Sequence, residues 1–188
     1  MKNFCINYAL KESRQSLKSA FYDLFKGEIP IVACIGTDAV IGDSLGPFTG
    51  SMIKQKIGGK TFVFGTVNDT ITAKDVGIVS EFLKNAYPDF PILAIDAALG
   101  KKNEIGAIKA FCGALKPGLG VDKKLKEIGT ATVIGVVEQK DGGKALLPMV
   151  RLSLVYNLAT VISDAFCEYV EESLSFKTQI KQTYAVNF

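Results

Sequence analysis

The stretch Ile31-Val-Ala-Cys-Ile-Gly36 decides the fold of this chain. An apolar run with no polar position is typical of a strand covered on both faces, as the strands of a parallel sheet are. The run leads into a glycine-rich loop, Thr37-Asp-Ala-Val-Ile-Gly-Asp-Ser-Leu-Gly-Pro47. Ser44 is a typical cap residue and Pro47 suits a first helical turn, so we predict a helix to about Ile57, ended by Gly58-Gly59.

The same alternation of strand and helix continues along the chain. Thr61–Phe64 predicts a second strand, and apolar residues at helical spacing over Val76–Ala86 predict a second helix. Ile92–Ile95 predicts a third strand after Pro88 and Pro91. Strands joined by helices indicate a mostly parallel, twisted sheet with right-handed crossovers. If the strand order is second, first, third, the first and third strands are neighbours.

Further elements flank this unit. Helical spacing predicts a helix over Leu10–Phe25, ended by Gly27, and a long closing helix from about Leu147 to Val170. Residues 106–111 and 131–137 are predicted to be two further strands. The chain is therefore expected to fold as an α/β protein.

Length and composition fit a single domain. The chain has 188 residues, of which 48% are hydrophobic and 22% are charged, which is enough for a substantial core. We expect one domain over residues 1–172. The polar residues 173–188 are expected to form a C-terminal tail that is either flexible or a segment for a partner.

Charge and hydropathy limit the partners and the location. The net charge of +3 is too small to indicate a nucleic acid partner. No apolar run approaches the ~20 residues that a membrane-spanning helix needs, and the first ten residues lack the apolar stretch of a signal peptide. We therefore expect a cytoplasmic protein without a membrane partner, and we leave self-association open.

The chain contains no histidine. A Ser-His-Asp triad and a Cys-His pair are therefore excluded, as is a His-ligated zinc site. The cysteines are widely spaced without a C-x-x-C pair, which disfavours zinc and a disulfide framework. They are Cys5, Cys34, Cys112 and Cys167. Cys34 and Cys112 lie in apolar runs and are expected to be small buried residues.

Two aspartates mark a candidate site. Asp96 directly follows the apolar run Ile92–Ile95, and Asp43 lies in the loop after the first strand. A buried carboxylate costs free energy unless it is paired or useful, and ligands of open α/β sheets bind at the carboxyl ends of the strands. If the two strands are neighbours, Asp43 and Asp96 flank one crevice. Alternatively, Asp96 only holds loop amides, and Asp43 or Ser44 only caps the helix.

A pair of carboxylates can hydrolyse a peptide bond without histidine or metal. Two close acids cannot both ionise readily, so the pKa of one rises. The ionised partner takes a proton from water, and the neutral partner donates one to the carbonyl or to the leaving amine. Asp38 adds a third carboxylate, which opens the alternative of an Mg²⁺ or Ca²⁺ site, although a solvated turn is the commoner role.

Two other features near the predicted site have simpler interpretations. Thr66, after Gly65, ends the second strand at the same edge and could line the pocket. A local basic cluster is expected to be a solvated loop, with an acidic peptide partner as the less favoured alternative. Its members are Lys116, Lys123, Lys124 and Lys126.

Taken together, the motifs resemble the YyaC-like family of sporulation proteins, often called spore proteases. The resemblance spans roughly Ile31 to Phe166. It rests on Cys34-Ile-Gly-Thr-Asp38, Gly42-Asp-Ser-Leu-Gly-Pro47, Gly65-Thr66, Ala94-Ile-Asp-Ala-Ala-Leu-Gly100, Lys116-Pro-Gly118 and Arg151-Leu152. The family is similar to germination protease and, more distantly, to hydrogenase maturation proteases. The resemblance implies a three-layer α/β/α fold of the phosphorylase/hydrolase type.

The resemblance also implies an activity: an aspartic-type endopeptidase that acts on a protein or peptide substrate during sporulation or germination. Asp43 and Asp96 match the catalytic aspartates, and neither a metal nor a cofactor is expected. The residues expected to shape the substrate pocket are Gly36, Thr37, Asp38, Ser44, Gly65 and Thr66.

Departures from the family pattern keep a second interpretation open. A basic residue often follows the first-loop aspartate in the family, and here it is Ala39. Thr70 and Thr72 stand where the family usually carries a proline and a histidine. These departures allow a non-catalytic binding or regulatory protein on the same fold.

Overall fold

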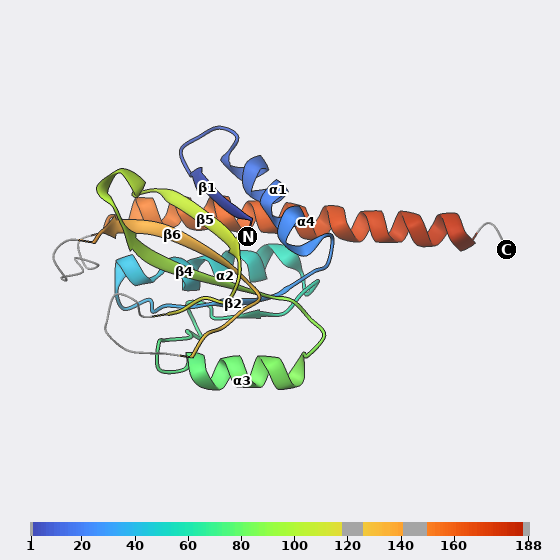
Figure 1. Ribbon diagram of the computed structural model, residues 1–188, viewed down its shortest axis with the longest axis horizontal. Coiled ribbons are helices and arrows are strands. Elements are labelled where there is room, and N and C mark those ends of the chain that lie inside the picture. The colour runs from blue at the N-terminus through green and yellow to red at the C-terminus, as the bar shows by residue number, and fades with distance from the viewer. Residues whose placement is uncertain (1, 118–125, 141–149, 186–188) are drawn as a thin grey trace.

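The computed structural model describes residues 2–117, 126–140 and 150–185, with side chains through Gln179. In these residues six strands form one sheet, with four α-helices around it (Figure 1). The strands are β1 (Asn3–Asn7), β2 (Ile31–Cys34), β3 (Val63–Phe64), β4 (Ile92–Gly100), β5 (Ala107–Cys112) and β6 (Ala131–Gln139). The helices are α1 (Ser13–Phe25), α2 (Leu45–Ile57), α3 (Val76–Ala86) and α4 (Leu152–Ala185), with short 3-10 turns η1 (Ile41–Asp43) and η2 (Lys102–Glu104).

The sheet is mixed, with strand order β1-β5-β6-β4-β2-β3. β3, β2, β4 and β6 are parallel to one another, whereas β5 is antiparallel to both β6 and β1. The order second, first, third for the first three predicted strands is confirmed, because β2 lies between β3 and β4. β2 and β4 pair residue by residue from Ile31 opposite Ile92 to Cys34 opposite Ile95. From this pair the chain adds strands in both directions, with β3 beyond β2 and β6 beyond β4. An open α/β sheet forms its ligand crevice at such a point.

The antiparallel edge is the part of the sheet that the sequence analysis missed. β1 has only five residues, with Phe4 and Ile6 between polar or exposed positions, and so short a pattern is a weak signal. β5 was predicted as a strand, but nothing in the sequence indicated its direction. Cys34 is buried as predicted, whereas Cys112 is exposed, because it is the last residue of β5.

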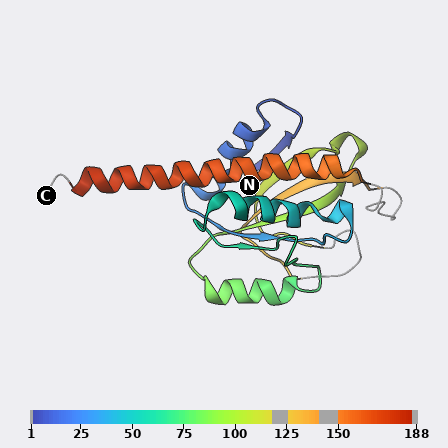
Figure 2. The ribbon, with the colours of Figure 1, turned by 180° about the vertical axis from the view of Figure 1, so that it is seen from behind.

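Helices cover both faces of the sheet. α1, α2 and α4 lie on one side and α3 lies on the other (Figures 1 and 2). Alternate strand residues supply two cores: Val32 and Leu93 pack with α1, α2 and α4, while Ala33 and Ala94 pack on the α3 side. Burial on both faces explains why β2 and the first half of β4 are apolar at every position.

Helix α2 packs unusually close to the sheet because its contact face contains glycine. A Cβ on Gly46 would lie 2.0 Å from the Ile35 carbonyl oxygen, and one on Gly50 would lie 2.0 Å from the Gly65 oxygen. The helix ends at Gly58, as predicted, in the left-handed region with a φ of 59°. The predicted side-chain cap is wrong, because the Ser44 hydroxyl donates to the Ile41 carbonyl at 2.7 Å instead.

Helix α4 differs most from its predicted bounds. It begins at Leu152 and continues without a break to Ala185, so residues 173–185 are helical, and the predicted start at Leu147 lies outside the described residues. Its inner face is fully buried at Leu158, Ile162 and Phe166. The C-terminal turns project well beyond the sheet (Figure 2). No helix in the described part of the chain has the length and apolar character to cross a membrane.

Candidate functional site

Asp96 lies inside a strand and not at its end. β4 continues to Gly100 because it pairs with β6, so the prediction that the strand stops at Asp96 is wrong. β2, however, leaves β4 one residue earlier, and the last bond between them is donated by the Ile35 N–H to the Ile95 oxygen at 2.7 Å. Asp96 is therefore the first residue of β4 beyond β2. Asp96 nevertheless lies beside the end of a strand, because the neighbouring strand β2 ends there.

The loop after β2 folds back on itself and fixes Asp43 beside the strand end. The Thr37 N–H donates to the backbone oxygen of Asp43 at 3.1 Å. Gly36 makes this return possible: its φ is +137°, and a Cβ there would lie 2.0 Å from the Asp43 oxygen. Asp43 closes the turn η1, which contacts β4, α2 and α4.

The two carboxylates interact, and Asp96 is the more buried of them. Asp96 is only 9% exposed, and strand alternation places it on the α3 side of the sheet with Ala94. Burial raises the pKa of Asp96 well above its ordinary value, and the negative charge of Asp43 raises it further. A hydrogen bond from the Ala97 N–H to Oδ1, at 2.8 Å, opposes this shift in part.

Asp43 is the acid that ionises first. Burial raises the pKa of Asp43 too, and a hydrogen bond from the Thr37 backbone opposes the rise. The pKa rises at both carboxyl groups, and it rises further at Asp96, which is the more buried of the two and is close to the Asp43 charge, so Asp96 keeps its proton to the higher pH. Within the described residues no lysine or arginine forms an ion pair with either carboxylate.

The other predicted site residues lie at the same edge but differ in what they offer a ligand. Thr37 is hydrogen-bonded to the Asp43 backbone, and Gly36 packs against the Asp43 carbonyl. Asp38 is exposed in that loop, and the Ser44 hydroxyl is bonded inside it to Ile41. Gly65 packs against the end of β2, since a Cβ there would lie 1.9 Å from the Cys34 oxygen.

A segment that the sequence analysis missed forms another wall of this region. Thr66 and Asp69 exchange backbone hydrogen bonds in a tight turn at 2.9 and 3.2 Å. Ile71 then pairs with Ile35 and accepts the Gly36 N–H at 2.9 Å, which extends the sheet past β3. The available signal was a single buried isoleucine between two threonines, too short to predict a strand.

Thr72, one of the family departures, has a structural partner. Its N–H and its hydroxyl both donate to Asp75 Oδ2, at 2.9 and 2.6 Å, just before α3. These bonds lower the pKa of Asp75. Thr72 therefore organises the start of a helix.

The two alternatives based on other charged groups receive no support. The described residues contain no group of three acidic, cysteine or histidine side chains placed to hold a metal ion, so the cation site with Asp38 is not formed there. Lys116 pairs with Glu127 and Lys126 pairs with Glu81, both at 3.2 Å, as expected of a solvated surface. Lys123 and Lys124 lie outside the described residues.

Two comparisons place the chain among known proteins. A family model described as "Protein of unknown function (DUF1256)" matches residues 5–165, which include both aspartates. The "Uncharacterized protein YyaC" of Bacillus subtilis (strain 168) is 34% identical over 173 residues, which cover 89% of this chain and 80% of that protein. The expected relationship to YyaC is thus confirmed, and neither description states an activity.

Proposed function

The chain belongs to the family described as protein of unknown function DUF1256, and on the chemistry of its paired aspartates we propose that it is an aspartic-type endopeptidase of the spore or germination protease kind. Its substrate is a peptide bond of a protein, cleaved in the cytoplasm of a sporulating cell or inside a spore. The fold proposed with this function is the three-layer α/β/α fold of the phosphorylase/hydrolase type.

The observation that carries the proposal is the electrostatic interaction between Asp43 and Asp96. One acid is buried and keeps its proton, and the other is more exposed and ionises first. Groups whose environments separate their pKa values in this way are suited to act as acid and base in one reaction. A purely structural role for a buried carboxylate would favour a cation beside it. Within the described residues no cation forms an ion pair with either acid.

In the proposed mechanism each aspartate has one task. Ionised Asp43 takes a proton from a water molecule, whose oxygen attacks the scissile carbonyl carbon. Protonated Asp96 donates its proton to the carbonyl oxygen, and the tetrahedral intermediate expels the amine once a proton reaches the nitrogen. Water is added across the C–N bond, and the protons are redistributed between the two carboxyl groups.

The test is peptidase activity of the purified chain and of amide variants. The substrate is a library of unfolded cellular proteins, and new chain ends are identified by mass spectrometry. Asp43→Asn and Asp96→Asn each remove one proton carrier with little change in volume. We expect each to lower cleavage by ~100-fold or more, the usual contribution of a general acid or base.

The matched control is Asp89→Asn, because Asp89 is an exposed acid just before the start of β4, at the opposite end of the strands from the site. This variant should cleave like the wild type. Unchanged cleavage by Asp43→Asn or Asp96→Asn would refute the catalytic pair. A folded wild-type chain that generates no new ends would leave the non-catalytic binding protein as the better description.

A further inference from the structure

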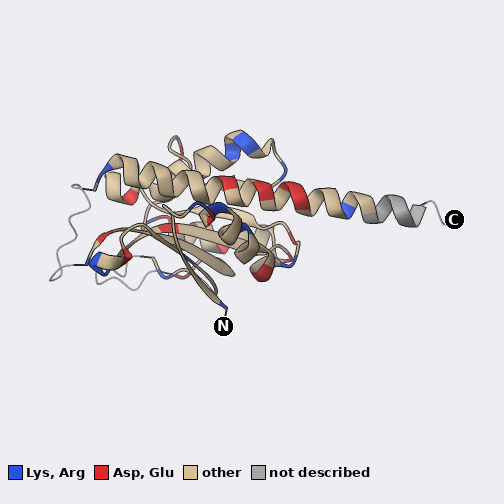
Figure 3. Ribbon diagram, turned by 90° about the horizontal axis from the view of Figure 1, so that it is seen from above, with Lys and Arg blue, Asp and Glu red and all other residues tan. Residues whose placement is uncertain are grey.

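The two edges of the sheet differ in how well they are protected from other strands. Folded proteins usually protect an edge strand by making it short, charged or irregular. The edge strand β3 has only two residues. The opposite edge strand, β1, has five, and every one of them pairs with β5 without a bulge (Figure 1). Asn3–Asn7 contains no proline and no charged residue (Figure 3). Among the described residues, β1 is therefore the edge that is open to another strand.

The hydrogen-bond pattern shows which backbone groups of β1 face outward. Just beyond the strand, the Tyr8 N–H donates to the Gly106 oxygen at 3.0 Å. In an antiparallel pair every second residue bonds to the neighbouring strand, so the even-numbered residues of β1 turn their backbone groups towards β5 and the odd-numbered ones turn theirs outward. Asn3 and Cys5 are exposed, and their outward N–H and C=O groups have no partner among the described residues.

The sequence of β1 reads almost the same in both directions. On either side of Cys5 stands an apolar residue, Phe4 or Ile6, and then an asparagine, Asn3 or Asn7. If two copies lie antiparallel about a two-fold axis at Cys5, Phe4 faces the other copy's Ile6, and each asparagine faces an asparagine. An aromatic and a β-branched residue form a favourable cross-strand pair, and no like charges meet. The outward backbone groups fit any extended strand, but this order of side chains fits a second β1.

We propose that β1 is a dimer interface, at which two copies of the strand pair antiparallel with Cys5 on the two-fold axis. Such an axis brings the same patch of both copies together. The two Cys5 residues exchange a pair of backbone hydrogen bonds, and each Asn7 N–H donates to the other copy's Asn3 oxygen. The Asn7 oxygen is less available, because it accepts the Leu10 N–H at 3.2 Å. The pairing joins the two sheets into one continuous sheet.

The first test places a charge on the two-fold axis. Sedimentation velocity over a range of concentrations measures the mass of the full chain, and the wild type is expected to be a concentration-dependent dimer. Cys5→Lys and Cys5→Glu each bring two like charges together and should each weaken association by ~5-fold or more. When the two variants are mixed, association should return, because lysine then faces glutamate. Only a residue that faces its own copy behaves in this way.

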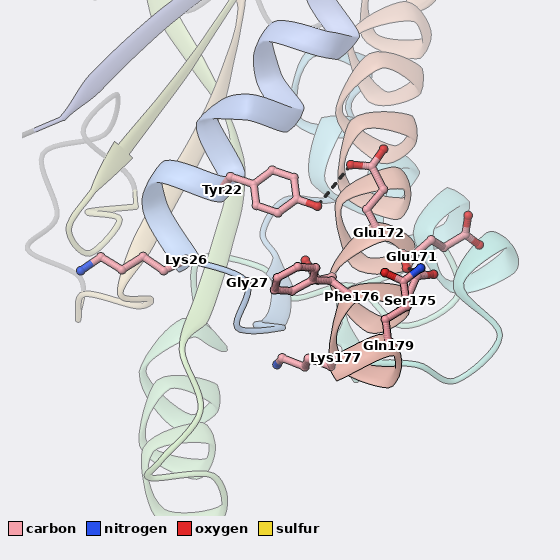
Figure 4. Close-up of a pocket in the computed structure, with 10 residues that line it drawn as sticks. Tyr22, Lys26, Gly27, Glu171, Glu172, Ser175, Phe176, Lys177 and Gln179 are labelled. Atoms are coloured by element: carbon pink, nitrogen blue, oxygen red, sulfur yellow. Dashed lines mark hydrogen bonds between the residues drawn. The ribbon is translucent and has the colours of Figure 1, made fainter. Parts of the chain in front are cut away.

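Two substitutions away from the axis are the controls. Cys112 is also exposed, but it is the last residue of β5 and does not lie on β1. Cys112→Lys should therefore dimerise like the wild type. Phe176 is 64% exposed and lines the groove between α1 and α4 (Figure 4), so Phe176→Asp should also leave the dimer intact.

Cross-linking of the wild type tests the register without a charge change. Opposite residues of an antiparallel pair have Cα atoms ~5.5 Å apart or less, so a short bismaleimide should join two chains through Cys5. Cys5→Ser should abolish the product, and Cys112→Ser should keep it. A monomeric wild type overturns the proposal, even where a strand of another protein binds β1. A dimer that responds to neither charge at Cys5 also overturns it, because its interface then lies elsewhere.

Discussion

At the scale of single residues, the carboxyl group of Asp96 decides what the site can do. It is buried at a point where β4 has lost β2 as a neighbour, and its described hydrogen bond comes from the next residue in the chain. One backbone donor is little compensation for a buried charge. The neutral acid is therefore the form that the fold favours, and a neutral acid is a proton donor.

This preference predicts how stability depends on pH. The unfolded chain loses the Asp96 proton near the ordinary value of 3.8, while the folded chain keeps it to a higher pH. Stability contributed by this group is therefore full below that value and falls as pH rises through the folded pKa. Asp96→Asn, which cannot ionise, should be more stable than the wild type at neutral pH and of equal stability in acid. Urea denaturation at the two conditions measures the difference.

Asp89→Asn is the control for this measurement, since exposed substitutions away from special features change stability by less than ~0.5 kcal/mol. If Asp96→Asn is instead the less stable protein at neutral pH, the ionised carboxylate has stabilising contacts, and the assignment of Asp96 as the proton donor is lost.

Part of the site was accessible from single residues. The absence of histidine and the position of two aspartates after apolar strands were enough to predict that Asp43 and Asp96 share one region. The roles of Ser44 and Thr72 could not be predicted. A hydroxyl bonds to whichever carbonyl or carboxylate the backbone brings near, and the turn geometry that brings it near is not specified by a short stretch of sequence.

At the scale of elements, the glycines of α2 determine how deeply the site loop is set. The Gly46 backbone lies against the end of β2, one turn after the loop that carries Asp43. The sequence predicted this helix from its proline and its terminal glycines. It did not predict the close contact, because a glycine inside a helix gives no sign of what packs against it.

Gly46→Ala and Gly77→Ala form a matched pair, because both place a methyl group on a helical glycine. At Gly46 the new carbon meets the Ile35 oxygen at 2.0 Å, so α2 must shift, and we expect a loss of about 2–3 kcal/mol in the free energy of unfolding. At Gly77 the nearest atom is Lys126 Cδ at 3.5 Å, and alanine should add up to ~1 kcal/mol through its helix propensity. Chemical denaturation measures both; a neutral Gly46→Ala would contradict the close contact.

The elements that the sequence predicted well share strong local patterns. α3 was predicted with its observed bounds, and β2 emerged from an uninterrupted apolar run. The predictions failed where pairing with residues far away in the sequence determines the length or direction of a strand. β4 is longer than its apolar segment because β6 supplies a second ladder of hydrogen bonds, and the antiparallel edge depends on pairing between residues about one hundred positions apart.

At the scale of the whole molecule, the candidate site and the projecting end of α4 are separate. The site lies where β2 and β4 diverge, and the projecting end of α4 lies beyond the body of the sheet (Figure 1). The family match ends at residue 165, before that projecting end begins. The projecting end can therefore be removed without touching the candidate site.

Removing residues 176–188 tests this separation. The shortened chain retains Leu174, which packs against the core, and the buried Ser173. Because the removed turns lie beyond the body of the sheet, the full and the shortened chain should have free energies of unfolding that agree within about 1 kcal/mol in urea denaturation, the scale of a peripheral change. A much larger loss would mean that the end of α4 stabilises the body of its own chain, and the two regions would then not be separate.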